Sequence, residues 1–199
     1  MSNKYNILIT GCSSGLGSYM SDVFENKGHN ILRHMGTNHH DLSTPEGVKS
    51  LSEEALDFGV NVLINNAAIV CPNVKLNNYD QYMIDKMINV NLKAPILLTT
   101  FLLTNLEKIV NINSMVGLEI KSPRTLYSAT KWGLRGFSNS LKKENTSIQI
   151  LDVYPTNIRT KPERKNAMDI DYVVQRIYDS FEKNEKELIL DGRIMWRQS

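Results

Sequence analysis

Tyr127 and Lys131 are four residues apart in the segment Tyr127-Ser128-Ala129-Thr130-Lys131. In a helix this spacing places both side chains on one face. An ammonium group beside a phenol favours the phenolate, so the lysine can lower the tyrosine pKa from its usual value of ~10. Such a pair can exchange a proton with an alcohol or a carbonyl, which is general acid–base chemistry. Because this spacing also arises by chance, its meaning depends on the rest of the chain.

A glycine-rich turn provides a second candidate site. The stretch Thr10-Gly11-Cys12-Ser13-Ser14-Gly15-Leu16-Gly17 lies between a short hydrophobic run and a helix-like segment. Glycines allow a tight turn and a close approach of the backbone to a phosphate, and a following helix offers free N–H groups at its positive end. The alternative is a turn that serves only the packing of the helix on the strand. The strand before it and the helix after it favour nucleotide binding.

Hydrophobic runs alternate with amphipathic segments along the chain. Strands are predicted at 5–10, 30–35, 61–65, 108–113, 147–154 and 187–191, and helices at 16–27, 45–58, 78–104, 125–143 and 171–182. Ser43 or Thr44 is available to cap the second helix, and Pro95 is expected to kink or break the third. This alternation predicts an α/β fold with a parallel sheet covered on both faces, in a single domain over residues 1–199.

The bulk composition narrows the class of protein. A net charge of +2 over 199 residues does not indicate a nucleic-acid or membrane partner. Two cysteines, Cys12 and Cys71, cannot form a disulfide framework, which suggests a reducing compartment. Neither a signal-peptide pattern nor an apolar stretch of ~18 to 20 residues is found. A cytoplasmic protein is therefore expected.

Four motifs occur in the order typical of the short-chain dehydrogenase/reductase family, which the chain resembles over roughly its first 160 residues. The glycine turn is similar to the TGxxxGxG loop, and Asn65-Asn66-Ala67-Ala68 to the NNAG motif. Ser114 precedes Tyr127 by thirteen residues, the usual serine-to-tyrosine interval, and Tyr127 with Lys131 completes YxxxK. The resemblance implies a Rossmann-like, doubly wound sheet.

The resemblance also implies catalytic roles. Tyr127 would be the general acid or base, and Lys131 would lower its pKa and hydrogen-bond the nicotinamide ribose. Ser114 would orient the substrate oxygen and stabilise its developing charge. Asn91 best matches a family asparagine that holds a water linked to the lysine, with Asn89 as the other candidate. A residue that caps or kinks the helix is the alternative for Asn91.

The cofactor-binding residues follow from the same motifs. They are Gly11, Ser13, Ser14, Gly15, Leu16, Gly17, Asp41, Leu42, Asn65, Asn66, Ala67, Ala68, Tyr127, Lys131, Pro155, Thr156, Ile158 and Thr160. Asp41-Leu42 resembles an acidic motif that contacts adenine, although a plain loop carboxylate is equally compatible. The family usually has Pro-Gly where this chain has Pro155-Thr156, so a larger side chain is expected to crowd the nicotinamide. Ala68 replaces the last glycine of NNAG.

NADP(H) is favoured over NAD(H) as the cofactor. An acidic residue after the second strand would bind the ribose hydroxyls and repel a 2′-phosphate, and none occurs between residues 28 and 40. Arg33 could pair with a 2′-phosphate, although the family register places Met35 or Gly36 at the discriminating position. The alternative for Arg33 is a solvated arginine at the end of a strand.

The adjacent His39 and His40 could suggest a metal site. Because no third ligand is evident nearby in the sequence, no metal is expected, and a surface loop is the better interpretation.

The chain also departs from the family by two deletions. About five residues separate Met35 from Asp41, where the family has a helix before its third strand, and a parallel crossover needs about a dozen. The third strand of the family is therefore vestigial, or is held beside the second strand by a tight loop, and the adenine end of the cofactor is expected to be more exposed.

The second deletion removes the substrate lid, because only about ten residues separate Thr160 from the next helix. The substrate pocket is expected to be open or closed by another subunit. Lys161, Arg164 and Lys165 could attract an acidic substrate there, or could simply form a solubilising charged loop.

The expected function is NADP(H)-dependent interconversion of a small-molecule carbonyl and alcohol. Hydride would pass between nicotinamide C4 and the substrate carbon while Tyr127 moves the proton. The alternative is a non-catalytic nucleotide-binding or regulatory protein on the same fold. An epimerase or dehydratase of nucleotide sugars is disfavoured by the short C-terminal portion. The resemblance also suggests a homodimer or homotetramer formed through residues 78–104 and 125–143.

Overall fold

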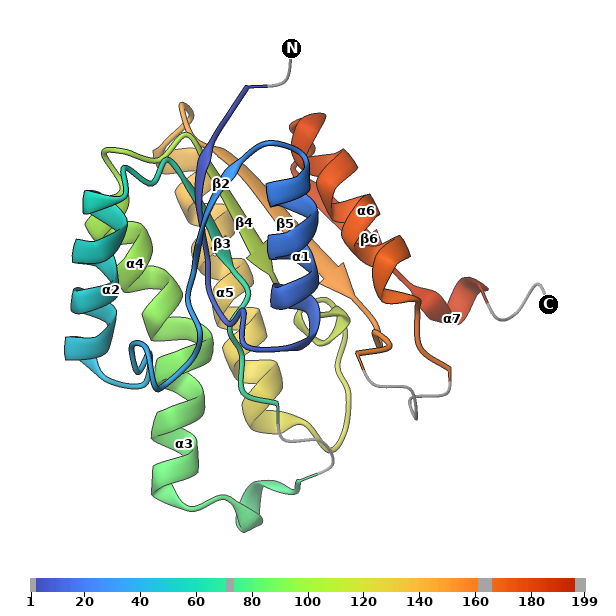
Figure 1. Ribbon diagram of the computed structural model, residues 1–199. Helices are drawn as coiled ribbons and strands as arrows, with labels where there is room; N and C mark the ends of the chain where they lie inside the picture. Colours follow the sequence, from blue (N-terminus) through green and yellow to red (C-terminus); the bar gives the residue numbers. More distant parts are fainter. Residues whose placement is uncertain (1–2, 71–73, 161–165, 196–199) are drawn as a thin grey trace.

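A six-stranded parallel sheet forms the centre of the molecule (Figure 1). The computed structural model describes residues 3–70, 74–160 and 166–195, with side chains through residue 193. The sheet has the order β2-β1-β3-β4-β5-β6, with every neighbouring pair parallel. The strands are β1 (Asn6–Ile9), β2 (Asn30–Arg33), β3 (Val62–Asn65), β4 (Lys108–Ile112), β5 (Gln149–Pro155) and β6 (Glu187–Leu190). All six lie within predicted strands except for the last residue of β5.

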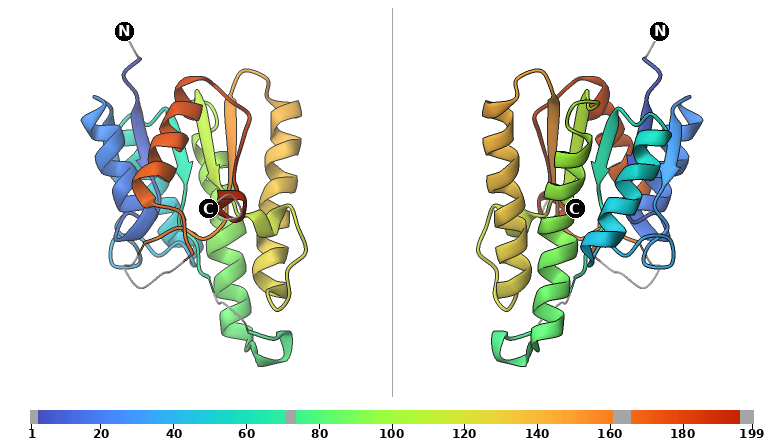
Figure 2. Two further views of the ribbon diagram at one scale, coloured as in Figure 1. Left: turned by 90° about the vertical axis from the view of Figure 1, so that its right-hand side faces the viewer. Right: turned by 90° about the vertical axis from the view of Figure 1, so that its left-hand side faces the viewer.

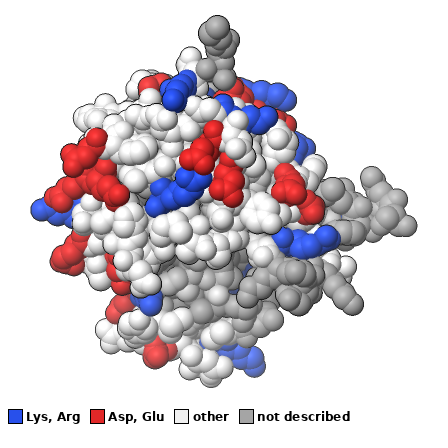
Figure 3. All heavy atoms as spheres, viewed as in Figure 1, with Lys and Arg blue, Asp and Glu red and all other residues white. Residues whose placement is uncertain are grey.

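Helices cover both faces of the sheet, as Figure 2 shows. They are α1 (Gly15–Asn26), α2 (Pro45–Asp57), α3 (Gln81–Ile88), α4 (Ala94–Leu102), α5 (Thr125–Glu144), α6 (Ile170–Glu182) and the short α7 (Gly192–Met195). The sequence pattern does not predict α7. None of the helices in the described ranges is both long and apolar enough to cross a membrane. The face seen in Figure 3 mixes acidic and basic side chains rather than gathering one sign.

Alternate residues of the strands build two separate cores. In β1, Ile7 and Ile9 pack with α1 and α6 on one side, whereas Leu8 packs with α2 and α4 on the other. β4 repeats this pattern, with Val110 on the first side and Ile109 on the second. Because a sheet buried on both faces needs apolar side chains at successive positions, these continuous hydrophobic runs form central strands.

A tight loop joins the edge strand β2 to α2. The described residues 34–44 contain no strand, so no strand is held beside β2 by this loop, and β2 is the edge of the sheet. Thr44 caps α2, because its Oγ1 accepts the Gly47 N–H at 3.1 Å. A Cβ at position 47 would stand 2.2 Å from the Asp41 carbonyl oxygen, so only glycine permits this close approach.

The predicted helix over residues 78–104 is interrupted near its centre. A π-helical segment, Asn89–Lys93, joins α3 to α4, and the Ala94 N–H bonds the Asn89 carbonyl five residues earlier. Pro95 has no N–H to donate to the carbonyl of Asn91, four residues before it. The kink or break expected at Pro95 therefore takes the form of a π-helical turn, in which the hydrogen bonds change locally while the chain stays helical.

Candidate functional site

Two adjoining cavities lie at the carboxyl ends of the central strands. One, of about 450 Å³, is lined by Ser114, Tyr127 and Lys131, and the other, of about 560 Å³, by the glycine turn. Asn66 and Ala68 line both cavities, so the two form one continuous cleft. In an open α/β sheet this is the edge where ligands bind. The structure thus brings Ser114, Tyr127 and Lys131 together with the glycine turn.

The glycine turn leaves the start of α1 open to an anion. Gly11 and Gly15 have φ angles of +74° and +61°, which side chains rarely adopt. A Cβ at Gly17 would stand 2.2 Å from the Gly11 carbonyl oxygen. Ser14 precedes the helix but makes no capping hydrogen bond through its side chain. The N–H groups of the first turn are therefore not satisfied by Ser14 and can face a phosphate.

Asn66 and Thr10 lock the glycine turn to the end of β3. Asn66 Nδ2 donates to the carbonyl oxygens of Thr10 at 2.8 Å and Gly11 at 3.2 Å. Thr10 Oγ1 accepts the N–H groups of Asn66 at 2.9 Å and Ala67 at 3.0 Å. These bonds fix the shape of the cleft floor, where Ala67 and Ala68 are also exposed to the cavity of the glycine turn.

Asn65, by contrast, points into the sheet. Its Nδ2 donates to Asn111 Oδ1 at 2.9 Å, and Asn111 Nδ2 donates in turn to Asp152 Oδ1 at 3.1 Å. Asp152 is fully buried and also accepts from Ser138 at 2.7 Å and Lys142 at 2.6 Å. Asn65 therefore lines neither cavity but belongs to a polar chain that ties β3, β4, β5 and α5 together beneath the cleft.

Ser114, Tyr127 and Lys131 are held by β4 and α5. Ser114 follows the end of β4, and Tyr127 and Lys131 occupy one face of the first turns of α5. Both α5 side chains are buried, with 6% and 2% of their surface exposed. Lys131 Nζ donates to the carbonyl oxygen of Ile112 at 2.8 Å and lies 5.8 Å from the Tyr127 ring centroid.

The pKa of Tyr127 differs from the sequence-based expectation. Burial raises it, while a hydrogen bond with the Ser114 side chain and the charge of Arg124 partly oppose this effect. Burial also lowers the pKa of Lys131 to about 8. Burial of the ring therefore dominates the pKa of Tyr127, and Lys131 Nζ bonds the Ile112 carbonyl. The role expected for Lys131 beside Tyr127 stays a prediction.

Asn91 and Asn89 take separate roles in the π-helical segment. Asn91 Oδ1 accepts the Ile69 N–H at 2.7 Å, and its Nδ2 donates to the Ile69 carbonyl at 2.9 Å. Asn89 instead donates to the Ser43 carbonyl at 2.9 Å. Asn91 is 1% exposed and lines neither cavity. The side chain of Asn91 thus positions the segment after Ala68, next to α5.

Asn113 is a site residue that the motif-based reasoning missed. Its Oδ1 accepts the Ser114 N–H at 2.9 Å, and its Nδ2 donates to the Lys131 carbonyl at 3.1 Å. A Cβ at Gly117 would lie 2.6 Å from this Oδ1, so that glycine makes room for the amide. Asn113 fixes Ser114 relative to α5. Its position directly after a buried strand was the available signal.

Arg33 does not reach the cavity of the glycine turn. Its guanidinium pairs with Glu25 at 2.8 Å and Asp22 at 3.3 Å, both on α1. In this structure, Arg33 is therefore not placed to contact a 2′-phosphate in the cavity of the glycine turn. Asp41 and Leu42 do line the cavity, and their contact with adenine stays a prediction. The pKa of Asp41 is lowered, chiefly by the hydrogen bond from the Ser43 N–H.

His34, rather than Arg33, lines the cavity of the glycine turn. Its Nδ1 accepts the Gly11 N–H at 3.1 Å, so its Nε2 carries the proton and donates to the His40 carbonyl at 2.8 Å. Burial lowers the pKa of His34, and the ring is neutral near pH 7. A neutral imidazole therefore connects the glycine turn to the loop before α2.

Pro155, Thr156, Ile158 and Thr160 line the cavity of Ser114, Tyr127 and Lys131, as expected. The Thr156 hydroxyl donates to the Leu190 carbonyl at 3.3 Å and accepts the Gly192 N–H at 2.9 Å. The Thr156 hydroxyl thus anchors the C-terminal segment. The sequence pattern predicts only that this side chain crowds the nicotinamide and does not predict this contact.

The C-terminal segment supplies part of the wall that a lid would otherwise form. Arg193 pairs with Glu119 at 2.7 Å and Asp191 at 2.8 Å, and both Arg193 and Glu119 line the cavity. On the same side of the cleft, the Met168 N–H donates to the Asn157 carbonyl at 2.9 Å. Lys161, Arg164 and Lys165 lie outside the described residues.

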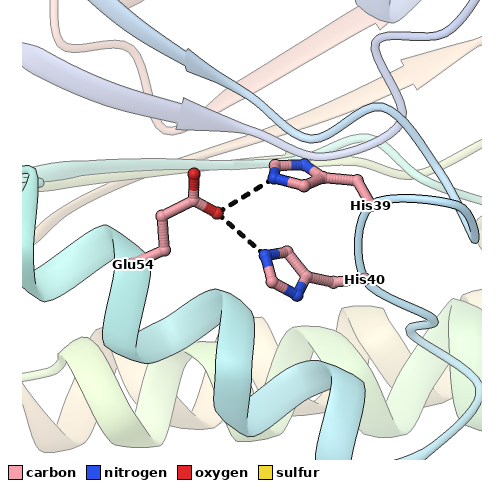
Figure 4. Close-up of side chains that lie close together, drawn as sticks. All are labelled: His39, His40 and Glu54. Atoms are coloured by element: carbon pink, nitrogen blue, oxygen red, sulfur yellow. Dashed lines mark hydrogen bonds and ion pairs between the residues drawn. The ribbon is translucent and has the colours of Figure 1, made fainter.

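The expectation that His39 and His40 lack a third partner is wrong. Glu54 of α2 reaches both rings, and its Oε2 lies 3.2 Å from His39 Nε2 and 2.8 Å from His40 Nε2 (Figure 4). The contact was hidden in the sequence because α2 folds back over the loop that carries the histidines.

Comparisons with known proteins agree with this geometry. A family model described as short chain dehydrogenase matches residues 33–170. A sorbitol-6-phosphate 2-dehydrogenase from Klebsiella pneumoniae is 25% identical, over 89% of this chain and 80% of that protein. A 3-oxoacyl-(acyl-carrier-protein) reductase from Salmonella typhimurium is 30% identical, over 81% and 77%.

Solved structures share the fold. A short-chain dehydrogenase from Sphingobium yanoikuyae in complex with NADPH has a TM-score of 0.79 at 23% identity, covering 93% of this chain and 87% of that chain. A 4-hydroxyisoleucine dehydrogenase complexed with NADH has a TM-score of 0.81 at 23% identity, covering 94% and 97%. With the family match spanning more than half of its residues, the chain belongs to the short chain dehydrogenase family and is an NAD(P)-dependent oxidoreductase.

Proposed function

We propose that the protein interconverts a small-molecule carbonyl and its alcohol with NADP(H), using Tyr127 as the general acid and base. The observation that carries this proposal is the convergence of Ser114, Tyr127 and Lys131 in a cavity continuous with the glycine turn. The open first turn of α1 fits a pyrophosphate, and Asn66 and Ala68 lie where the two halves of a dinucleotide would meet. When bound, the nicotinamide supplies or accepts the hydride.

The protein residues then handle the proton. In the direction of reduction, Ser114 hydrogen-bonds the substrate oxygen, and the Tyr127 hydroxyl donates its proton to that oxygen as the carbon receives hydride. The resulting phenolate is stabilised by Ser114 and by the charge of Arg124, both of which lower the pKa of Tyr127. Because burial raises this pKa, Tyr127 holds its proton at neutral pH and is ready to act as an acid. Reduction should therefore dominate near neutrality, and oxidation should need alkaline pH.

The preference for NADP(H) is supported by the missing acid after β2. Asp41 is the one carboxylate among the described residues that line the cavity of the glycine turn, and its Oδ1 already accepts the N–H and hydroxyl of Ser43. Ser13, Gly36 and Thr37 leave this wall without a charge to repel a 2′-phosphate. NADPH should bind more tightly than NADH in calorimetric titrations. Equal affinity, or a preference for NADH, would reject this part of the proposal.

A screen of NADPH oxidation over a panel of carbonyl compounds tests the reaction. The Tyr127→Phe variant keeps the ring but removes the proton donor, so turnover should fall by about 10² to 10⁴-fold. Cofactor affinity should change little, which serves as the control for folding. Undiminished turnover in Tyr127→Phe with intact cofactor binding would sink the mechanism.

The protein should assemble as a homodimer or homotetramer through α3, α4 and α5. These helices expose large apolar side chains: Tyr82 is 64% exposed, Phe101 44% and Trp132 43%. Such side chains on neighbouring helices favour burial against a second copy. Light scattering should give a multiple of 22.6 kDa, and Trp132→Glu should shift the mass towards that of one chain. A monomeric wild-type protein would contradict the expectation.

A cytoplasmic location also stays a prediction.

A further inference from the structure

A group of three metal-ligating side chains lies beside the cavity of the glycine turn. His39 and His40 follow each other in the loop before α2, and Glu54 projects from α2 itself. One ligand atom from each, an imidazole nitrogen of each histidine and a carboxylate oxygen, lie within 4.8 Å of one another. Figure 4 shows both rings directed at the same oxygen, Glu54 Oε2. In the described part of the chain this is the one such group.

The spacing of these atoms suits a small cation. A metal with bonds of about 2.0 to 2.2 Å holds its ligand atoms roughly 3 Å apart. The two distances to Glu54 Oε2, 3.2 Å from His39 and 2.8 Å from His40, are already in this range. The centroids of the two rings lie 4.3 Å apart, so the imidazoles are next to each other beside Glu54. With hydrogen bonds alone, the N–H groups of both rings must share Glu54 Oε2. A cation would instead accept a lone pair from each imidazole nitrogen and from the carboxylate oxygen.

The types of ligand select the class of metal. Two imidazoles and one carboxylate are typical of Zn²⁺ and related divalent transition ions, whereas Mg²⁺ and Ca²⁺ prefer oxygen ligands throughout. His39 is exposed and the other two are half-buried, so an ion can enter from solvent. Three protein ligands leave room for water at the remaining position.

We propose that His39, His40 and Glu54 form a binding site for a divalent transition-metal ion of the Zn²⁺ type, which holds the loop before α2 in place. Such an ion would join this loop to α2. His40 also lines the cavity of the glycine turn, and its carbonyl accepts from His34, which in turn accepts the Gly11 N–H. The metal would thus brace the wall that contacts the adenosine half of the cofactor, a consequence that rests on the proposed function. Ser114, Tyr127 and Lys131 lie in the other cavity, so the ion takes no part in proton transfer.

Titration of the full, tag-free protein with Zn²⁺ in the absence of cofactor tests the site. We expect one saturable site per chain, at least about tenfold weaker in His39→Ala and in Glu54→Gln. The matched control is Glu53→Gln, which removes a neighbouring carboxylate of α2 that faces Lys49 at 3.8 Å. Affinity in Glu53→Gln should match the wild type, and Mg²⁺ should not bind. Absence of saturable binding, or undiminished affinity in Glu54→Gln, would overturn the proposal. Because glutamine is nearly isosteric with glutamate, a thermal melt suffices to confirm that each variant is folded.

A second titration separates the bracing effect from the site. NADP⁺ affinity should rise several-fold when Zn²⁺ is present, and this gain should vanish in Glu54→Gln, because coupling between two sites is reciprocal. Equal NADP⁺ affinity with and without Zn²⁺ would overturn the bracing role. A protein that binds no nicotinamide cofactor would refute the proposed function instead, and the Zn²⁺ titration alone would still decide whether the metal site exists.

Discussion

Replacing Lys131 with methionine should make the protein more stable at neutral pH. The ammonium of Lys131 is buried, and in the described part of the chain its hydrogen-bond acceptor is the carbonyl of Ile112. Burial lowers the pKa of Lys131 from 10.5 to about 8. A lysine whose folded-state pKa lies below its unfolded value binds its proton less tightly when folded, so the charge opposes folding.

The size of this penalty follows from the two pKa values. Below about pH 8 both states hold the proton, and the charge of Lys131 lowers the free energy of unfolding by about 3 kcal/mol. As the pH rises from about 8 to about 10.5, the folded protein releases the proton first and the penalty disappears. Between about pH 7 and about pH 9.5, the relief amounts to about 2 kcal/mol. Lys131→Met removes the charge, so its stability should lack this pH dependence.

Urea unfolding of the wild type and Lys131→Met at these two pH values measures the effect. The advantage of the variant at about pH 7 should shrink by about 2 kcal/mol at about pH 9.5. Lost packing and the lost hydrogen bond to Ile112 act at both pH values, so the difference isolates the charge. Lys49→Met, at a side chain that is 70% exposed, controls for the loss of one positive charge that water solvates in both states. The same stability difference at both pH values would refute the reasoning.

Three further substitutions test the cleft. Gly17→Ala would place a methyl group 2.2 Å from the Gly11 carbonyl oxygen and so disturb the turn. Cofactor affinity measured by calorimetry should therefore fall at least about tenfold. An unchanged affinity would contradict the need for glycine at this position. Arg124→Gln removes a charge that lowers the pKa of Tyr127, so the pH profile of alcohol oxidation should move to higher pH, and a shift to lower pH would contradict this. Thr156→Gly releases the N–H that starts α7, so hydrogen exchange in the C-terminal segment should accelerate; protection equal to the wild type would show that the hydroxyl is dispensable.

Local patterns in the sequence were sufficient to predict the sheet and the two halves of the cleft. Parallel strands end at the same edge, so residues directly after predicted strands, such as Gly11 and Ser114, had to converge there. Helical periodicity likewise placed Tyr127 and Lys131 on one face of α5. These inferences needed only the order of the elements and the direction of the strands.

Features that depend on contacts between distant elements could not be predicted in this way. Arg33 turns to α1 because Asp22 and Glu25 lie across from the end of β2, and sequence spacing does not show this neighbour. Glu54 reaches His39 only because the tight loop sets α2 beside it. The raised pKa of Tyr127 results from burial, which depends on the packing of the whole site.

The short connection after Thr160 changes which residues can select a substrate. With no described helix between Thr160 and α6, the walls of the cavity come from the turn after β4, the start of α5 and the C-terminal segment. Arg193 is neutralised there by Glu119 and Asp191, whereas Arg124 and Lys121 have no acidic partner in the described part of the chain. Selectivity should therefore respond to changes at α7 and at residues 119–124 more than to changes in the glycine turn. Exchanging Glu119 for glutamine leaves Arg193 paired with Asp191 but removes one negative charge from the wall of the cavity. This should lower KM for carbonyl substrates that carry a negative charge and leave KM for neutral ones nearly unchanged.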